Sequence, residues 1–152
     1  MMDDVDQAIL RELQLHARLS NVELARRVHL SPPAVHARVK RLEDSGLIER
    51  HVTMLNRQRA GFDMLCFVGV RLQFHETKQV AGFHDSIAKM PEVLECHHVT
   101  GEYDYLLKVI ARNTEDLEDF LLRRLTPVPG VAHIQTSLVL REVKATSAIP
   151  IP

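Results

Sequence analysis

Two short helical patterns, separated by a four-residue break, constrain this chain more than any other feature of its sequence; they lie within residues 20–50. Ser20 can cap the first helix, and Glu23 follows at the spacing of a capping box. Ser31 can cap the second helix, with Pro32 at its first position, where the missing N–H costs nothing. This arrangement predicts a helix-turn-helix.

The second helix of this pair has one apolar stripe and one small, basic face. Val35, Val39 and Leu42 recur at helical spacing, so we expect them to be buried together. The opposite face suits a helix whose first turns enter a major groove while later cations meet phosphates. The candidate DNA-contacting residues are Ser31, Pro33, Ala34, His36, Ala37, Arg38, Lys40, Arg41 and Arg50. The alternative is an ordinary helical bundle with a solvated basic face.

Segments on either side extend this motif to a small domain. An acidic turn at residues 3–4 predicts an earlier helix, whose apolar stripe would complete a three-helix core. Gly46 is a typical stop after the last helix, and we interpret residues 47–55 as a wing strand. The sequence therefore predicts a winged helix-turn-helix DNA-binding domain at residues 1–60, ending in a linker at residues 56–61.

Charge is divided unevenly along the chain, whose net charge is −1. Residues 1–60 carry ten Lys and Arg against eight Asp and Glu, and residues 61–152 carry nine against twelve. Residues 26–59 contain eight cations and three anions, which suits a surface that faces phosphates. A dense basic coat is absent from the sequence, so groove contacts and the avidity of a dimer would have to supplement electrostatic attraction.

The composition argues against a secreted or membrane-spanning protein. No apolar run is long enough to span a bilayer, and the N-terminal MMDDVDQ is acidic and lacks an apolar signal core. We therefore expect a soluble, cytoplasmic protein without a membrane partner. Cys66 and Cys96 lack the CxxC spacing of metal or redox motifs, so we assign no chemistry to either thiol.

The second half of the chain alternates strand and helix patterns, and Gly69 marks a possible bulge in the first strand. The predicted elements are a strand at 64–73, a helix at 76–89, strands at 94–99 and 103–111, a helix from Asn113 or Thr114 to the stop at Pro127, and a strand at 133–143. This βαββαβ order is the ferredoxin-like unit, with both helices on one face of a four-stranded antiparallel sheet. The chain is therefore expected to be α+β, with this domain at residues 61–144 and a tail at residues 145–152.

The other face of that sheet must be covered, and the sequence offers no third helix to cover it. Packing of two sheets in a homodimer would provide the cover. A dimer is also what a helix-turn-helix needs in order to contact two half-sites on double-stranded DNA. Both halves of the chain thus predict a homodimer.

Residues 3–144 resemble the Lrp/AsnC family, the feast/famine transcriptional regulators of bacteria and archaea. The resemblance rests on the module LSNVELARRVHLSPPAVHARVKRLEDSGLIER, the connector LN at residues 55–56, and ECHHVTGEYDYLL at a hairpin of the second domain. Arg57 departs from the pattern, because many members carry Pro there, and we expect only linker stiffness to change. The resemblance implies a DNA-binding domain, and a second domain that dimerises, assembles into tetramers or octamers and binds an amino acid between dimers.

One turn of the second domain matches the effector turn of that family; its residues are Thr100, Gly101, Glu102, Tyr103, Asp104 and Tyr105. Free backbone N–H groups beside Gly101 could hold an α-carboxylate, while Asp104 could hold an α-ammonium. In the alternative interpretation Gly101 serves only turn geometry, the two tyrosines pack, and Asp104 only caps the hairpin.

Metal binding and enzymatic activity are the remaining alternatives. Cys96, His97 and His98 could suggest a metal, but strand alternation puts His97 on the opposite sheet face from the other two. The sirohaem decarboxylases of haem biosynthesis look similar in architecture, and nine histidines, including His51, are compatible with such an enzyme. A basic helix would serve no purpose in a tetrapyrrole enzyme, so we favour a regulator without a cofactor. A DNA-organising protein without an effector is a third possibility.

Overall fold

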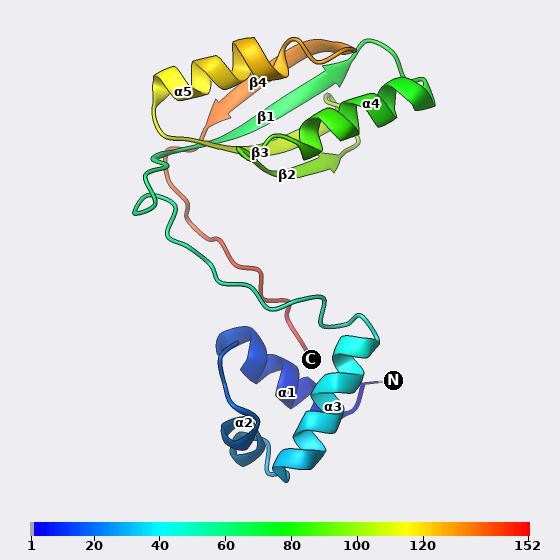
Figure 1. Cartoon of the computed structure of the whole chain (residues 1–152), viewed down its shortest axis with the longest axis vertical. Coiled ribbons are helices and arrows are strands. Elements are labelled where there is room, and N and C mark those ends of the chain that lie inside the picture. Colours follow the sequence, from blue (N-terminus) through cyan, green and yellow to red (C-terminus); the bar gives the residue numbers. More distant parts are fainter. Residues whose placement is uncertain (1) are drawn as a thin grey trace. The chain divides into compact units, whose positions relative to one another are not determined.

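Figure 1 shows the computed structural model of the chain, which describes residues 2–152. The chain forms two compact units. One contains the residues up to Met54 together with Lys144–Pro152, and the other is Leu55–Val143. Residues 144–152 therefore belong to the N-terminal unit by their contacts, although they follow the second unit in sequence. No helix among the described residues is long and apolar enough to cross a membrane.

The N-terminal unit contains three helices, which are α1 (Asp4–Leu15), α2 (Asn21–Arg27) and α3 (Pro32–Asp44). Each begins directly after an expected capping residue whose side-chain oxygen accepts a backbone N–H of the first turn; the caps are Asp3, Ser20 and Ser31. His29 has a φ of 55° in the turn before α3, and Gly46 has a φ of 77° after it. The predicted helix-turn-helix is confirmed.

The reciprocal capping box forms at a different helix from the expected one. Ser20 accepts a hydrogen bond from the Glu23 N–H at 3.1 Å, but the Glu23 carboxylate binds Arg26 and Arg27 instead of returning to the cap. The complete box lies at α1, between Asp3 and Asp6. The Glu23 side chain therefore pairs with two arginines of α2 instead of completing the capping box.

No strand follows α3, so the predicted wing strand at residues 47–55 is corrected. The N–H groups of Leu47 and Ile48 both donate to the Leu42 carbonyl at 3.1 Å and close the end of α3. Beyond them the segment has no neighbouring strand within the described chain, and an extended segment without a ladder partner is not a stable strand. Met54 and Leu55 remain exposed.

The second unit has the predicted ferredoxin-like architecture. Its elements are β1 (Met64–Leu72), α4 (Thr77–Ala88), β2 (Val93–His98), β3 (Tyr105–Ala111), α5 (Thr114–Asp119), its π-helical continuation η1 (Phe120–Leu125), and β4 (Val131–Leu138). The sheet order is β2-β3-β1-β4 with antiparallel neighbours throughout. The last strand ends at Leu138, earlier than expected.

Both helices of this unit contribute to one core on a single face of the sheet. Phe83 from α4 and Phe120 at the end of α5 pack with alternate residues of the central strands, among them Val68 of β1 and Leu107 of β3. The opposite face carries Phe67, which is 39% exposed, and no helix of the described chain covers it. This uncovered face is the one for which the sequence predicted a partner.

Gly69 does not form the expected bulge; the register of β1 with β4 instead shifts between Arg71 and Leu72. Gly69 lies on the uncovered face beneath the ring of Tyr103. A Cβ added to Gly69 would lie 2.7 Å from the nearest ring carbons. The glycine is therefore required for the close approach of an aromatic ring to the strand.

We predict that Gly69→Ala displaces Tyr103 and lowers the free energy of unfolding by about 1–3 kcal/mol, the usual cost of overpacking. Urea denaturation of the full chain measures the effect. Gly82→Ala is the matched control, because that α4 position has open space and alanine favours a helix. Equal stability of the Gly69 variant and the wild type would contradict the packing argument.

Candidate functional site

The first turns of α3 present small side chains; the exposed or partly exposed residues there are Ser31, Pro33, Ala34, His36 and Ala37. His36 is held in place, because its Nδ1 lies 3.2 Å from Nδ2 of Asn21 on α2. Lys40 follows one turn later and is exposed, with Nζ 3.3 Å from the Asp44 carboxylate. This part of α3 is accessible, and its contact with a DNA groove stays a prediction.

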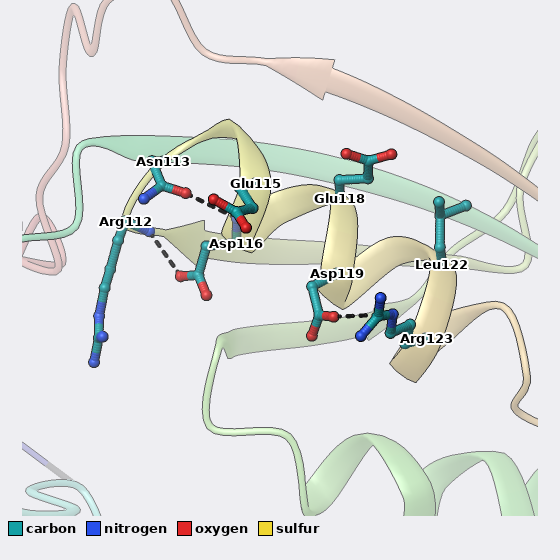
Figure 2. Close-up of a pocket in the computed structure, with 8 residues that line it drawn as sticks. All are labelled: Arg112, Asn113, Glu115, Asp116, Glu118, Asp119, Leu122 and Arg123. Carbon is teal, nitrogen blue, oxygen red and sulfur yellow. Dashed lines mark hydrogen bonds and ion pairs between the residues drawn. The ribbon is translucent and has the colours of Figure 1, made fainter.

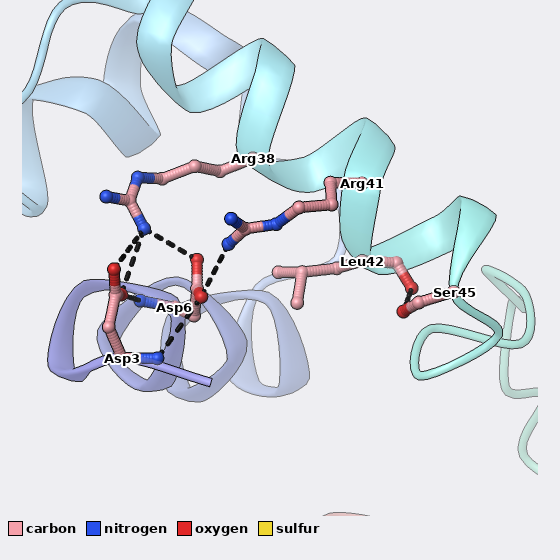
Figure 3. A network of polar contacts seen from close by, with 6 residues as sticks. All are labelled: Asp3, Asp6, Arg38, Arg41, Leu42 and Ser45. Carbon is pink, nitrogen blue, oxygen red and sulfur yellow. Dashed lines mark hydrogen bonds and ion pairs between the residues drawn. The ribbon is translucent and has the colours of Figure 1, made fainter. Parts of the chain in front are cut away.

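Arg38 and Arg41 lie differently from the other candidates. Figure 3 shows both guanidinium groups directed at the start of α1. Arg38 Nη1 lies 2.8 Å from Asp6 Oδ1 and 2.7 Å from Asp3 Oδ2, and Arg41 Nη2 lies 2.6 Å from Asp6 Oδ2. The expected outward position is corrected for Arg38, which is 28% exposed and binds α1, whereas Arg41 contacts Asp6 and stays exposed.

A buried carboxylate explains this arrangement. Asp6 is 1% exposed, and a buried anion is tolerated only when cations and donors surround it. Arg38 also holds the pKa of the Asp3 carboxyl below its usual value, chiefly through their hydrogen bond. Arg41 remains 57% exposed, so part of its guanidinium can still face a phosphate.

Other cations of the N-terminal unit differ in whether a carboxylate pairs with them: Arg26 and Arg27 are paired. Hydrogen bonds from Arg26 and then Arg27 lower the pKa of Glu23 to about 2, so this carboxylate stays charged at neutral pH. Arg50 has no ion-pair partner within residues 2–152. Lys40 and Arg50 are therefore the most available cations among the predicted DNA-contacting residues.

The turn between β2 and β3, residues 99–104, forms the second candidate site. Gly101 has a φ of 114°, which favours glycine. The backbone N–H groups of four consecutive residues have no hydrogen-bond acceptor within the described chain; they are Thr100, Gly101, Glu102 and Tyr103. Arg71 of β1 fixes the turn by donating from Nη2 and Nε to the Glu102 carbonyl at 2.8 and 3.1 Å. Such unpaired donors suit an anion.

Asp104 stabilises this turn by binding β1 and the residues after it. Its Oδ2 accepts the Leu72 N–H at 2.7 Å, and its Oδ1 lies 3.2 Å from His75 Nε2. The Asp104 backbone N–H donates to the Val70 carbonyl at 3.0 Å. The capping role foreseen in the alternative interpretation is thus present, while Oδ1 faces only the exposed His75 and can accept a further donor.

The two tyrosines of the turn point to opposite faces of the sheet. The Tyr103 hydroxyl donates to Gln135 on β4. Tyr105 is buried on the helical side, where its hydroxyl lies 2.8 Å from His84 Nε2 and burial raises its pKa. Its ring stacks on His98 at 4.9 Å. Tyr105 is therefore a core residue, separated by the sheet from Tyr103.

The histidines and cysteine of β2 follow the predicted alternation. Cys96 pairs with Leu107 and His98 with Tyr105, both on the helical side, whereas His97 pairs with Leu106 on the other. The residues that the structure describes include no group of three or more His, Cys, Asp or Glu able to hold a metal.

A cavity that the sequence did not indicate lies along α5 (Figure 2). Its volume is about 540 Å³, and its lining residues are Arg112, Asn113, Glu115, Asp116, Glu118, Asp119, Leu122 and Arg123. Several of these groups already serve the helix. Asp116 accepts the Arg112 N–H at 3.0 Å, and Asn113 caps α5 by accepting the Asp116 N–H at 2.8 Å. The cavity is a shallow, open depression along α5 and the start of η1.

A capped helix-turn-helix joined to a ferredoxin-like unit with a glycine turn defines a two-domain transcriptional regulator. Residues 2–49 match the family model of a winged helix-turn-helix DNA-binding domain. Residues 65–149 match that of the Lrp/AsnC ligand binding domain. The chain belongs to the Lrp/AsnC family of transcriptional regulators.

Similar proteins cover the whole chain. The transcriptional regulator AzlB of Bacillus subtilis is 34% identical over 99% of this chain and 96% of its own length. The leucine-responsive regulatory protein of Escherichia coli is 37% identical over 99% and 92%. Among solved structures, the regulator NMB0573 of Neisseria meningitidis in complex with L-Met superposes with a TM-score of 0.95 at 36% identity, over 99% and 97% of the two chains.

We predict that Asp6→Asn lowers the free energy of unfolding by about 2–3 kcal/mol, because the neutral amide has only one acceptor oxygen and leaves one of the two arginines facing an NH2 group in a buried position. Urea denaturation is the measurement. Asp4→Asn in the same turn is the control, since Asp4 is exposed and should change stability by less than about 0.5 kcal/mol. Similar stabilities of the two variants would show that the Arg38–Asp6–Arg41 contacts do not hold the unit together.

Proposed function

We propose that this chain binds double-stranded DNA sequence-specifically as a homodimer through α3, and that a free amino acid bound at residues 99–104 changes its assembly or its DNA affinity. The observation that carries the first part is the exposed, small-residue start of α3, held against α1 by the buried Asp6. Small side chains let the helix approach base edges closely.

The ion pairs of α3 divide its residues into two roles. Arg38 positions the helix through Asp3 and Asp6 instead of reaching a base edge. Lys40 and Arg50, with the exposed part of Arg41, supply phosphate contacts. Because these cations are few, a dimer that engages two half-sites is required for useful affinity.

The free donors of the turn support the amino-acid proposal. An α-carboxylate would accept the N–H groups around Gly101, and an α-ammonium would donate to Asp104 Oδ1 in competition with His75. Relatives of similar fold support an amino acid as effector: NMB0573 is solved with L-Met, and so is the feast or famine regulatory protein of M. tuberculosis, at 29% identity and a TM-score of 0.87 over 100% of both chains.

The uncovered face of the sheet supports self-association. Phe67 on β1 lies opposite Lys108 on β3, whose Nζ pairs with Glu95 at 3.0 Å. Phe67 is apolar, and the neighbouring Lys108 is already neutralised by Glu95 of the same sheet. Such a face suits packing against an identical face. We infer a homodimer, assembling further into tetramers or octamers. We also infer that the protein is a regulator and not an enzyme, because the similar proteins are named as regulators.

For the DNA interface, we predict that Ala37→Glu lowers affinity for a selected DNA sequence at least tenfold, because it places an anion at the phosphate-rich groove. Lys40→Ala should weaken binding to all sequences and reduce the salt slope by about 1. Fluorescence anisotropy at several salt concentrations measures both effects. Ala81→Glu on the exposed surface of α4 is the matched control. Wild-type DNA binding by Ala37→Glu would exclude α3 as the reading helix.

For the effector site, we predict that Asp104→Asn abolishes amino-acid binding and leaves basal DNA affinity within about twofold. The amide oxygen can still accept the Leu72 N–H, so the turn keeps its shape while the charge for the ammonium is lost. Calorimetry with the twenty amino acids measures binding, and Asp85→Asn on α4 is the control. If wild type and Asp104→Asn bind the same ligand equally well, the pocket lies elsewhere.

A further inference from the structure

The last residues of the chain return to the N-terminal unit and lie beside α1 (Figure 1). We propose that residues 144–152 are a docking segment for the outer face of α1, which gives the DNA-binding unit a second connection to the rest of the chain. The occupant of this face is the chain's own tail. The sequence alone gave this segment no role, because it shows no helical or strand period.

Gln14 provides the central contact. Its Nε2 donates to the Ile149 carbonyl at 2.9 Å, and its Oε1 accepts the Ile149 N–H at 2.6 Å. One side-chain amide thus satisfies both backbone groups of one tail residue, as a neighbouring strand would do in a ladder. The contact depends on the backbone of Ile149, whose side chain is mostly exposed.

Two further contacts extend the docking site along α1. Arg11 Nε donates to the Ile151 carbonyl at 3.5 Å, and Arg11 also contacts the Pro152 carbonyl. Gln7 fixes the same guanidinium by accepting from Nη2 at 3.2 Å. The Ile151 side chain packs against the core of the three helices. Gln7, Arg11 and Gln14 recur at helical spacing, so they form one face of α1.

The tail sequence favours this conformation before docking. Ile149 and Ile151 each precede a proline, which disfavours the helical region and leaves both residues extended. The prolines themselves fix φ near the value of an extended chain. Thr146 Oγ1 accepts the Ala148 N–H at 3.1 Å and orders the turn before the extended stretch. A segment that is already extended loses little conformational entropy on binding.

Arg57 links the segment that enters the second unit before β1 to the segment that leaves it after β4. Its Nη2 donates to Glu142 Oε1 at 3.0 Å, beyond the end of β4, and its Nη1 donates to the Phe62 and Asp63 carbonyls at 2.7 and 2.8 Å. This is the position where many family members carry proline, and here its side chain bridges the segment after α3 and the segment after β4. A unit attached through two joined segments has less rotational freedom than one attached through a single linker.

The docking arm of the test uses NMR amide exchange on the full chain. We expect the Ile149 amide to be protected, and Gln14→Ala to accelerate its exchange at least tenfold, because the loss of one neutral hydrogen bond is worth about tenfold and Gln14 makes two to Ile149. Ile151→Ser should also accelerate it by removing the apolar anchor. Gln79→Ala on the exposed surface of α4 is the matched control and should have no effect. Unprotected Ile149 in the wild type, or equal rates in wild type and Gln14→Ala, would overturn the docking.

The functional arm rests on the proposed DNA binding. A chain ending at Val143, and separately Gln14→Ala, should bind the selected DNA sequence about threefold to tenfold more weakly, because an untethered unit loses more orientational freedom on binding. Unchanged affinity in both would overturn the tethering role. If the wild type bound no DNA at all, the proposed function would fail, whereas the exchange of Ile149 would still decide whether the tail docks.

Discussion

The buried carboxylate of Asp6 is the interaction on which the geometry of the N-terminal unit depends. A desolvated anion must be paired, and the two arginines that pair with it come from α3. This fixes α3 relative to α1 with directional bonds, which apolar packing alone does not provide. It also withdraws Arg38 from the proposed DNA-facing surface. The contacts that orient α3 therefore also neutralise part of its positive charge. The accessible face of α3 is left with small residues and few cations.

The candidate effector turn, residues 99–104, shows the same division between residues that position the site and groups that could bind a ligand. Arg71 and Asp104 are both engaged in shaping the turn. The groups left for an anion are main-chain N–H donors, which recognise a carboxylate without reference to the side chain attached to it. Discrimination between amino acids must then come from apolar residues around the turn, where one methylene changes affinity by roughly 1–3 kcal/mol. Such a site would accept several related amino acids.

Local signals in the sequence predicted the helices and the βαββαβ succession of the second unit, because caps, periodicity and turn residues act over a few positions. The predictions that were wrong or missing concern residues whose roles depend on partners far away in the sequence. Periodicity placed Arg38 outward, but its long side chain reaches Asp6 on another helix. The segment at 47–55 alternates only loosely and has no ladder partner in the described chain. The role of Gly69 depends on the ring of Tyr103, and the tail binds through backbone groups, which leave no hydrophobic pattern. The glycine turn was found from its motif, whereas Arg71 carried no sequence signal.

These contacts form a continuous path between the two candidate sites. Tyr103 of the turn donates to Gln135 on β4, β4 leads into the tail, and the tail binds Gln14 on α1, which also carries Asp6. A path of contacts transmits a signal only when one of its elements has two discrete arrangements. A segment held by a few hydrogen bonds and one isoleucine can be bound or released. Release of the proposed docking segment is therefore the step through which a ligand at the proposed site would change the freedom of α3.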